Sequence, residues 1–147
     1  MWLQVLLHLP HLQQYKVGRG MRTAQQAVAW GKTQVTHPDE NYYEKCEHFV
    51  RTALGLPAYA ASAKIAADKV PAAQRHTDTS NIPPGAQVFY VGGSSGHVTL
   101  SVGGGKVLTN DYCTKGKICE APWNLPNWHN AEKFSFWTMW TPYGEVK

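Results

Sequence analysis

Three segments in the first half of the chain place apolar residues at helical spacing: 23–35, 42–54 and 60–70. Thr23 and Asn41 stand where N-cap residues are expected for the first two segments. Glycine and proline follow the second segment and proline follows the third, which ends a helix in each case. The pattern predicts three helices before residue 71.

The second half of the chain changes to the period of strands. Residues 97–102 alternate strictly, with valine and leucine on one side and histidine, threonine and serine on the other. Glycine-rich turns flank this segment, and a tryptophan-rich loop precedes the last strand. The segments predicted as strands are 86–91, 97–102, 106–111 and 134–140. Helices followed by an antiparallel sheet predict an α+β domain.

The composition is that of one globular domain. The 147 residues include 43% hydrophobic and 16% charged residues, which suffices for a single core. The net charge of +4 is scattered, whereas a dedicated nucleic-acid binder gathers its charge in a basic patch. No segment approaches the roughly 18 apolar residues of a membrane span. We expect a monomer with neither nucleic acid nor a membrane as its partner.

The first 20 residues are predicted to lie outside the domain. They begin with an apolar stretch, but they lack the basic region and the small-residue cleavage site of a signal peptide. The Gly-Arg-Gly before Met21 is what a ribosome-binding site would encode if it were translated, so Met21 is a candidate start. The sequence predicts an extension over residues 1–20 and a single domain over residues 21–147.

The three cysteines do not make a complete disulfide framework. Cys113 and Cys119 are close enough in sequence to pair across a short turn or to stay reduced, and Cys46 is left as a free thiol. Cys113, Cys119 and His129 form an alternative zinc half-site, but the Cys-x-x-Cys spacing of such sites is missing. We expect no metal and no cofactor.

Cys46 and His97 are the candidates for nucleophilic chemistry. A thiol needs a base to take its proton, and a helix N-terminus favours the thiolate. Cys46 lies early in the second predicted helix, and His97 begins a strand directly after a glycine-rich loop. Spacing alone leaves the alternative open that Cys46 is a structural cysteine and His97 a surface residue.

The register of two predicted strands points to Asp111 as a third member of the site. A three-residue turn at 103–105 sets Leu100 opposite Leu108 and His97 opposite Asp111, so that apolar residues meet and an acid stands beside the base. Asp111 then orients the imidazole and stabilises its cation. Asn110 is the alternative for this role, and Asp111 as a plain turn residue is another.

Longer stretches around these residues resemble a known superfamily. Residues 41–51 (NYYEKCEHFVR) are similar to the nucleophile helix of NlpC-like and CHAP cysteine peptidases and amidases, especially the catalytic domains of actinobacteriophage endolysins. Residues 82–86 (IPPGA) and 96–103 (GHVTLSVG) resemble their histidine strand, and 109–111 (TND) resembles the acidic end of the next strand. The resemblance implies a papain-like fold. Lys45 departs from the aspartate of many members, but a lysine there also favours a thiolate.

The resemblance further implies a peptidoglycan hydrolase that cleaves an amide bond of the stem peptide through a thioester on Cys46. Whether the enzyme is an amidase, cutting the sugar–peptide link, or an endopeptidase stays open. The backbone N–H of Cys46 is the expected oxyanion donor, and Tyr42 is either a second donor or a packing aromatic.

The expected partner is bacterial peptidoglycan. We expect synthesis in the cytoplasm and action at the wall, after release through a phage holin or secretion by another route. One rival is a related acyl-transfer enzyme, such as a deamidase or a transglutaminase-like toxin. The other rival is a non-catalytic wall-binding domain.

Overall fold

A computed structural model describes residues 20–128 and 132–147. All but the last residue of the predicted extension lies outside the described residues, and so does His129 of the alternative zinc site. In the described part of the chain, no helix combines the length and the apolar character needed to cross a membrane.

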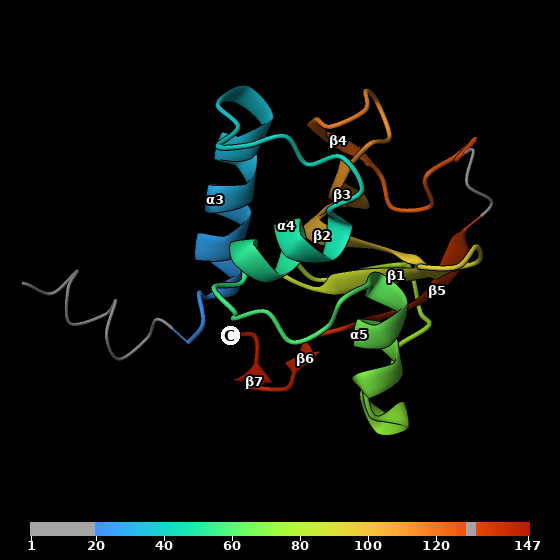
Figure 1. The fold of residues 1–147 in the computed structure, drawn as a ribbon. Coiled ribbons are helices and arrows are strands. Elements are labelled where there is room, and N and C mark those ends of the chain that lie inside the picture. The colour runs from blue at the N-terminus through green and yellow to red at the C-terminus, as the bar shows by residue number, and fades with distance from the viewer. Residues whose placement is uncertain (1–19, 129–131) are drawn as a thin grey trace, which may run out of the picture.

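The helices come first along the chain and the strands follow (Figure 1). The helices are α3 (Ala24–Thr36), α4 (Cys46–Ala53), α5 (Ala63–Lys69) and the short 3-10 helix η1 (Ala72–Gln74). The strands are β1 (Gln87–Val91), β2 (His97–Gly103), β3 (Lys106–Asn110), β4 (Ile118–Pro122), β5 (Lys133–Thr138), β6 (Trp140–Thr141) and β7 (Gly144–Glu145). This order confirms the predicted α+β class.

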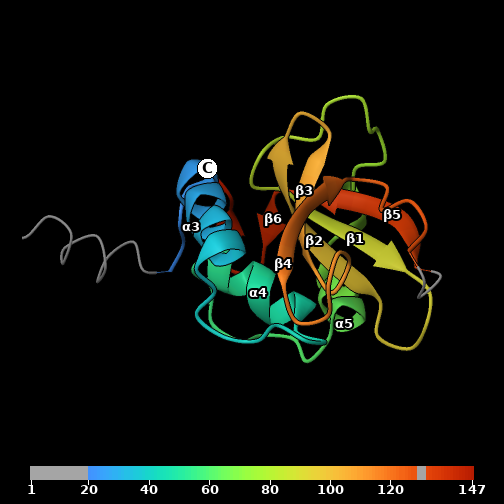
Figure 2. The same cartoon turned by 90° about the horizontal axis from the view of Figure 1, so that it is seen from above.

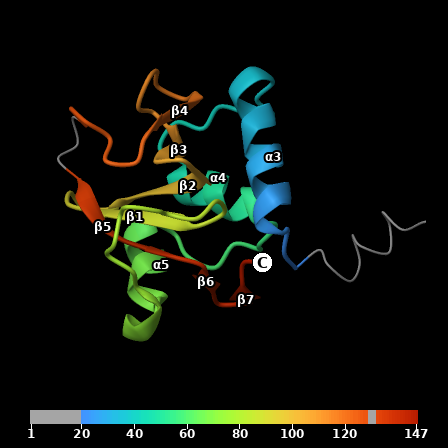
Figure 3. The same ribbon diagram turned by 180° about the vertical axis from the view of Figure 1, so that it is seen from behind.

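The five longer strands form one antiparallel sheet in the order β4-β3-β2-β1-β5. Strands β6 and β7 pair separately as a small hairpin. The helices α3, α4 and α5 gather on one face of the sheet, with α4 across β2 and α5 beside β1 (Figures 1 and 2). The view from behind shows the sheet edge-on, with β1 and β5 on the side of α5 (Figure 3).

Two hydrophobic clusters cover the two faces of the sheet. The larger one lies under the helices and contains Phe49, Val50, Val98, Leu100 and Leu108, each no more than 1% exposed. The smaller one lies on the opposite face and contains Ile82, Ala86, Val88, Tyr90, Val107, Ala121, Leu125 and Trp137. The alternation along β1 and β3 supplies both clusters, because successive side chains of a strand point to opposite faces.

Local chemistry explains where the helices begin. Thr23 and Gln26 form a capping box at the start of α3, as the sequence predicts for Thr23. The prediction that the second helix begins at residue 42 is wrong, since α4 begins at Cys46. Glu44 has a φ of 55°, which is incompatible with a continuing right-handed helix. Ser62 caps α5, so this helix also starts later than predicted.

The strand predictions are confirmed for β1, β2, β3 and β5, with small shifts at their ends. The predicted pairing of Leu100 with Leu108 is also confirmed. The turn differs, because the register shifts between Ser101 and Gly103 and Gly103 pairs with Lys106. Gly103, which the prediction placed in a three-residue turn, is therefore part of the strand. A β-bulge between Ser101 and Gly103 accommodates the extra residue. Strand β4 lies where the sequence predicted only loop.

Candidate active site

Cys46 is the first residue of α4, where the backbone N–H groups have no partners within the helix. The preceding Lys45 provides no side-chain cap bond. Cys46 is a half-buried free thiol. The positive end of the helix dipole therefore lies directly at the sulfur, in the environment expected for a nucleophilic cysteine.

The protonation of Cys46 reflects two opposed effects. Burial raises the pKa of the thiol to about 11. The backbone amide of Val98 is the strongest of the groups that lower it, and the amides of Glu47 and Cys46 itself act in the same direction. At neutral pH the thiol is protonated, so a base must take its proton when it attacks.

Cys46 and His97 line one pocket with a volume of about 660 Å³. Its walls come from the start of α4, the segment between α4 and α5, the glycine-rich turn before β2, and the end of β3. The polar and aromatic residues at its walls include Glu44, Lys45, Glu47, His48, Arg51, Ser62, Ser94, Asn110, Asp111, Trp128 and Glu132. Among the described residues no hydrogen bond joins the thiol to the His97 ring. Such bonds are often long in an enzyme without substrate.

His97 begins β2 and is 5% exposed. The Trp128 ring lies over it at a centroid distance of 4.8 Å, and the Tyr90 ring lies 5.8 Å away. Burial lowers the pKa of His97 to about 4. The imidazole is therefore neutral at pH 7 and has a lone pair with which to accept a proton.

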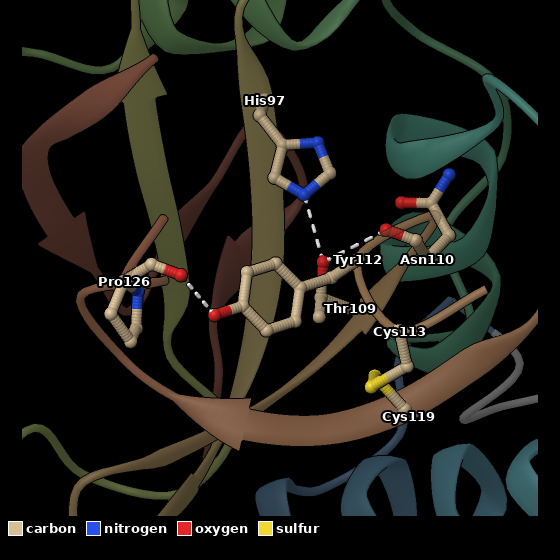
Figure 4. The surroundings of a disulfide bond; sticks show 7 residues. All are labelled: His97, Thr109, Asn110, Tyr112, Cys113, Cys119 and Pro126. Carbon is tan, nitrogen blue, oxygen red and sulfur yellow. Dashed lines mark hydrogen bonds between the residues drawn. A yellow bond between two sulfur atoms is a disulfide. The ribbon is translucent and has the colours of Figure 1, made fainter. Parts of the chain in front are cut away.

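Thr109 on β3 fixes which ring nitrogen carries that lone pair. The Thr109 Oγ1 lies 2.8 Å from His97 Nε2 and donates its own hydrogen to the backbone carbonyl of Asn110, at 3.1 Å (Figure 4). Because the hydroxyl hydrogen is used on that carbonyl, Oγ1 accepts from Nε2–H. The lone pair is then on Nδ1, the nitrogen on the far edge of the ring from Thr109.

Replacing Thr109 by valine is expected to lower turnover about tenfold, because Nε2–H loses its acceptor and the tautomer is no longer fixed. Thr109→Ser keeps the oxygen and is the matched control, with turnover near that of the unmodified protein. Initial rates of wall clearing, the activity that the sequence leads us to expect, measure both. Equal rates for the valine and serine variants would exclude Thr109 from this role.

Asp111 lies at the pocket but makes its hydrogen bonds away from His97. Its Oδ2 accepts from the amide of Glu44 at 2.7 Å, and its Oδ1 accepts from the amide of Gly116 at 2.6 Å. The predicted pairing with His97 assumed that the strand continues to Asp111, but β3 ends at Asn110 and Asp111 has a φ of 61°. The backbone turns there, and Thr109 makes the bond to the ring instead.

Asn110, the predicted alternative, faces the helix side of the sheet. Its Nδ2 donates to the backbone carbonyl of Tyr42 at 2.8 Å, and no hydrogen bond of Asn110 reaches His97. Tyr42 itself is 1% exposed, and its hydroxyl donates to Gln34 at 2.5 Å. Of its two predicted roles, oxyanion donor or packing aromatic, Tyr42 therefore fits the second. The backbone N–H of Cys46 remains the candidate oxyanion donor.

Glu47, the residue after Cys46, is a buried acid that sequence reasoning missed. It is 5% exposed, and among the described residues neither carboxylate oxygen has a partner in good hydrogen-bond geometry, although the Tyr59 hydroxyl lies nearby. Burial raises the pKa of Glu47 to about 8, although Arg51 and the nearby Tyr59 hydroxyl act to lower it. The negative charge of ionised Glu47 is one of the effects that raise the pKa of the Cys46 thiol. The sequence signal for its burial was its position three residues before apolar Val50, which puts both side chains on the same face of the helix.

Cys113 and Cys119 form a disulfide, which resolves the alternative left open by their spacing. Within the described ranges, no group of three or more histidine, cysteine, aspartate or glutamate residues is arranged to hold a metal ion.

The fold is similar to that of a solved NlpC/P60 family protein from Bacillus cereus, with a TM-score of 0.57 and 16% sequence identity. The match covers 83% of this chain and 41% of that one, so the chain spans less than half the length of that protein. Neither a protein-family model nor a curated protein matches the sequence. The comparison confirms the predicted papain-like, NlpC-like α+β fold.

Proposed function

We propose that this protein is a cysteine hydrolase that cleaves an amide bond in the stem peptide of bacterial peptidoglycan. One observation carries the proposal: a free cysteine at a helix N-terminus shares a pocket with a neutral, oriented histidine. The likeness to an NlpC/P60 protein supports a cell-wall peptidase or amidase. An endolysin that acts at the wall after release from the cell is the specific form that we propose.

The proposed reaction is acyl transfer. His97 Nδ1 takes the thiol proton as Cys46 Sγ attacks the amide carbonyl, and the backbone N–H of Cys46 stabilises the oxyanion. His97 then gives the proton to the leaving amine, and the C–N bond breaks to leave a thioester. Water attacks the thioester with His97 as the base, which releases the acid and restores the thiol. Because burial lowers the pKa of His97 to about 4, the imidazole is unprotonated over the neutral range and its Nδ1 lone pair is available to the thiol proton.

The test is incubation of the full chain with purified actinobacterial peptidoglycan, followed by turbidity measurements and mass spectrometry of the soluble fragments. We expect clearing and fragments with one new amine and one new carboxylate. Sugars whose lactyl carboxylate has been freed would identify an amidase. Stem peptides cut at an internal bond would identify an endopeptidase. Binding to walls without any new amine would favour the wall-binding rival. Transfer of the acyl group to an added amine would favour a transglutaminase-like enzyme.

Inhibition should distinguish thiol from metal chemistry. We expect iodoacetamide to abolish wall clearing, because Cys46 is the free thiol among the described cysteines. EDTA should change the rate by less than about twofold, since the proposed steps use only the thiol, the imidazole and a backbone amide. Loss of activity in EDTA that added zinc restores would overturn the thiol mechanism.

A further inference from the structure

The turn between β3 and β4 is closed by the disulfide of Cys113 and Cys119, whose Cα atoms lie 6.3 Å apart (Figure 4). Cys113 is exposed and Cys119 is half-buried, so a reductant can reach the bond. The proposed reaction does not use this disulfide. The disulfide holds the shape of the turn, and the other side of this turn lies against the segment that precedes Cys46.

Two hydrogen bonds join the turn to that segment, and a third lies within the turn. The amide of Tyr42 donates to the Gly116 carbonyl at 2.9 Å. Asp111 accepts from the amides of Glu44 and Gly116 through its two oxygens, at 2.7 and 2.6 Å. The contact is close, because a Cβ on Gly116 would lie 2.5 Å from Asn41 Oδ1. Asp111 therefore ties the turn to a residue two positions before the nucleophile.

The backbone at both ends of this tie is in a costly conformation. Glu44 and Asp111 have φ values of 55° and 61°, and neither is glycine. A left-handed backbone is unfavourable for a residue with a side chain and persists only where the surroundings hold it. The bend at Glu44 determines that α4 starts at Cys46, which places the N–H groups of the helix end at the thiol.

We propose that Asp111 is a positioning residue for Cys46, and that the Cys113–Cys119 disulfide holds the turn so that Asp111 can bind the Glu44 amide. Reduction of the disulfide therefore lowers turnover. Dithiothreitol supplies the two electrons and two protons that convert the disulfide to two thiols, and it becomes the cyclic disulfide. The effect on turnover rests on the proposed hydrolase function. The placement of residues 44–46 by Asp111 and the disulfide does not depend on that function.

Amide nuclear magnetic resonance spectra of the full chain test the structural part without any substrate. We expect reduction, and separately the double substitution Cys113→Ser and Cys119→Ser, to shift the amide signals of Glu44, Lys45 and Cys46 as well as those of the turn. Signals of α5 and β5 should stay in place. Changes confined to residues 112–119 would overturn the proposal.

Wall-clearing kinetics test the consequence for turnover. Asp111→Ala should lower kcat on the order of 10- to 100-fold with little change in KM, because a displaced nucleophile costs rate rather than binding. Asp111→Asn should lose much less, since asparagine tolerates a positive φ and keeps one acceptor oxygen. Reduction should lower kcat roughly three- to tenfold. Asp68→Ala removes an exposed carboxylate on α5 and is the matched control, with an unchanged rate.

The outcomes separate this inference from the proposed function. Shifts at residues 44–46 in a protein that does not clear walls would support the positioning role and refute the hydrolase. Wall clearing that is indifferent to reduction and to Asp111→Ala would keep the hydrolase and refute the positioning role. A third outcome is that Asp111→Asn lowers kcat as much as Asp111→Ala and also shifts the ring signals of His97. This outcome would refute the positioning of Cys46 and show that Asp111 orients His97 instead.

Discussion

Replacing Cys46 by alanine is expected to abolish wall clearing while leaving the protein folded. The substitution removes one sulfur from a half-buried position, which costs about 1 kcal/mol of stability. It also removes the atom that forms the thioester. In a serine hydrolase the loss of the nucleophile lowers turnover on the order of 10⁶-fold, and no neighbouring side chain here offers a replacement thiol.

Two measurements check this prediction. Thermal unfolding should give nearly the same midpoint for Cys46→Ala and the unmodified protein, and turbidity of a wall suspension should stay constant with the variant. Ser80→Ala is the matched control, because Ser80 is exposed and is not among the residues that line the pocket. Clearing by Cys46→Ala at the normal rate would exclude the thioester mechanism.

Local sequence patterns predicted the elements that depend on local chemistry. Thr23 caps α3 because its side chain accepts from the amide three residues later, an interaction contained in four consecutive residues. The alternation of residues 97–102 predicted β2, and the requirement that apolar residues meet predicted the pairing of Leu100 with Leu108. These features need no knowledge of distant contacts.

The elements that the sequence did not predict depend on distant contacts. Helical spacing continues through residues 42–45, but distant contacts, among them the bond from Glu44 to Asp111, hold this segment in another conformation, and the helix starts later. Strand β4 has little strand character of its own and is defined by pairing with β3. The same holds for Asp111, because the alternation along a strand gives no sign of the positive φ that turns it away.

The candidate site was predicted to a different extent for each residue. The structure places Cys46 and His97 in one pocket, as the sequence suggested, and their chemical roles stay predictions. Thr109 was passed over because a hydroxyl is a weaker signal than a carboxylate. It lies on the same strand face as His97, diagonal to it in the observed register, and it reaches the ring.

Glu47 should make the protein less stable as the pH rises through neutrality. Its pKa is about 8 in the folded protein and near 4.5 in the unfolded chain, because burial disfavours the charged form. Between these values the folded state holds the proton and the unfolded state does not. The contribution is therefore fully present below pH 4.5 and is lost as the pH rises through 8. Below pH 6.5 the lowered pKa of His97 makes the protein more stable as the pH rises, which opposes the effect of Glu47. The range from pH 6.5 to 9 therefore reports on Glu47.

Glu47→Gln removes this ionisation and keeps the shape of the side chain. The free energy of unfolding of the unmodified protein should fall on the order of 2 kcal/mol from pH 6.5 to 9, and that of the variant should stay nearly level. At pH 9 the variant should be the more stable protein, since an amide does not carry an unpaired charge into the site that Glu47 occupies. Urea unfolding at several pH values measures the slopes. Glu145→Gln, at an exposed carboxylate, is the matched control and should keep the slope of the unmodified protein. If the slopes of the Glu47→Gln variant and the unmodified protein coincide, Glu47 is already ionised in the folded state, and Arg51 offsets its burial more strongly than we expect.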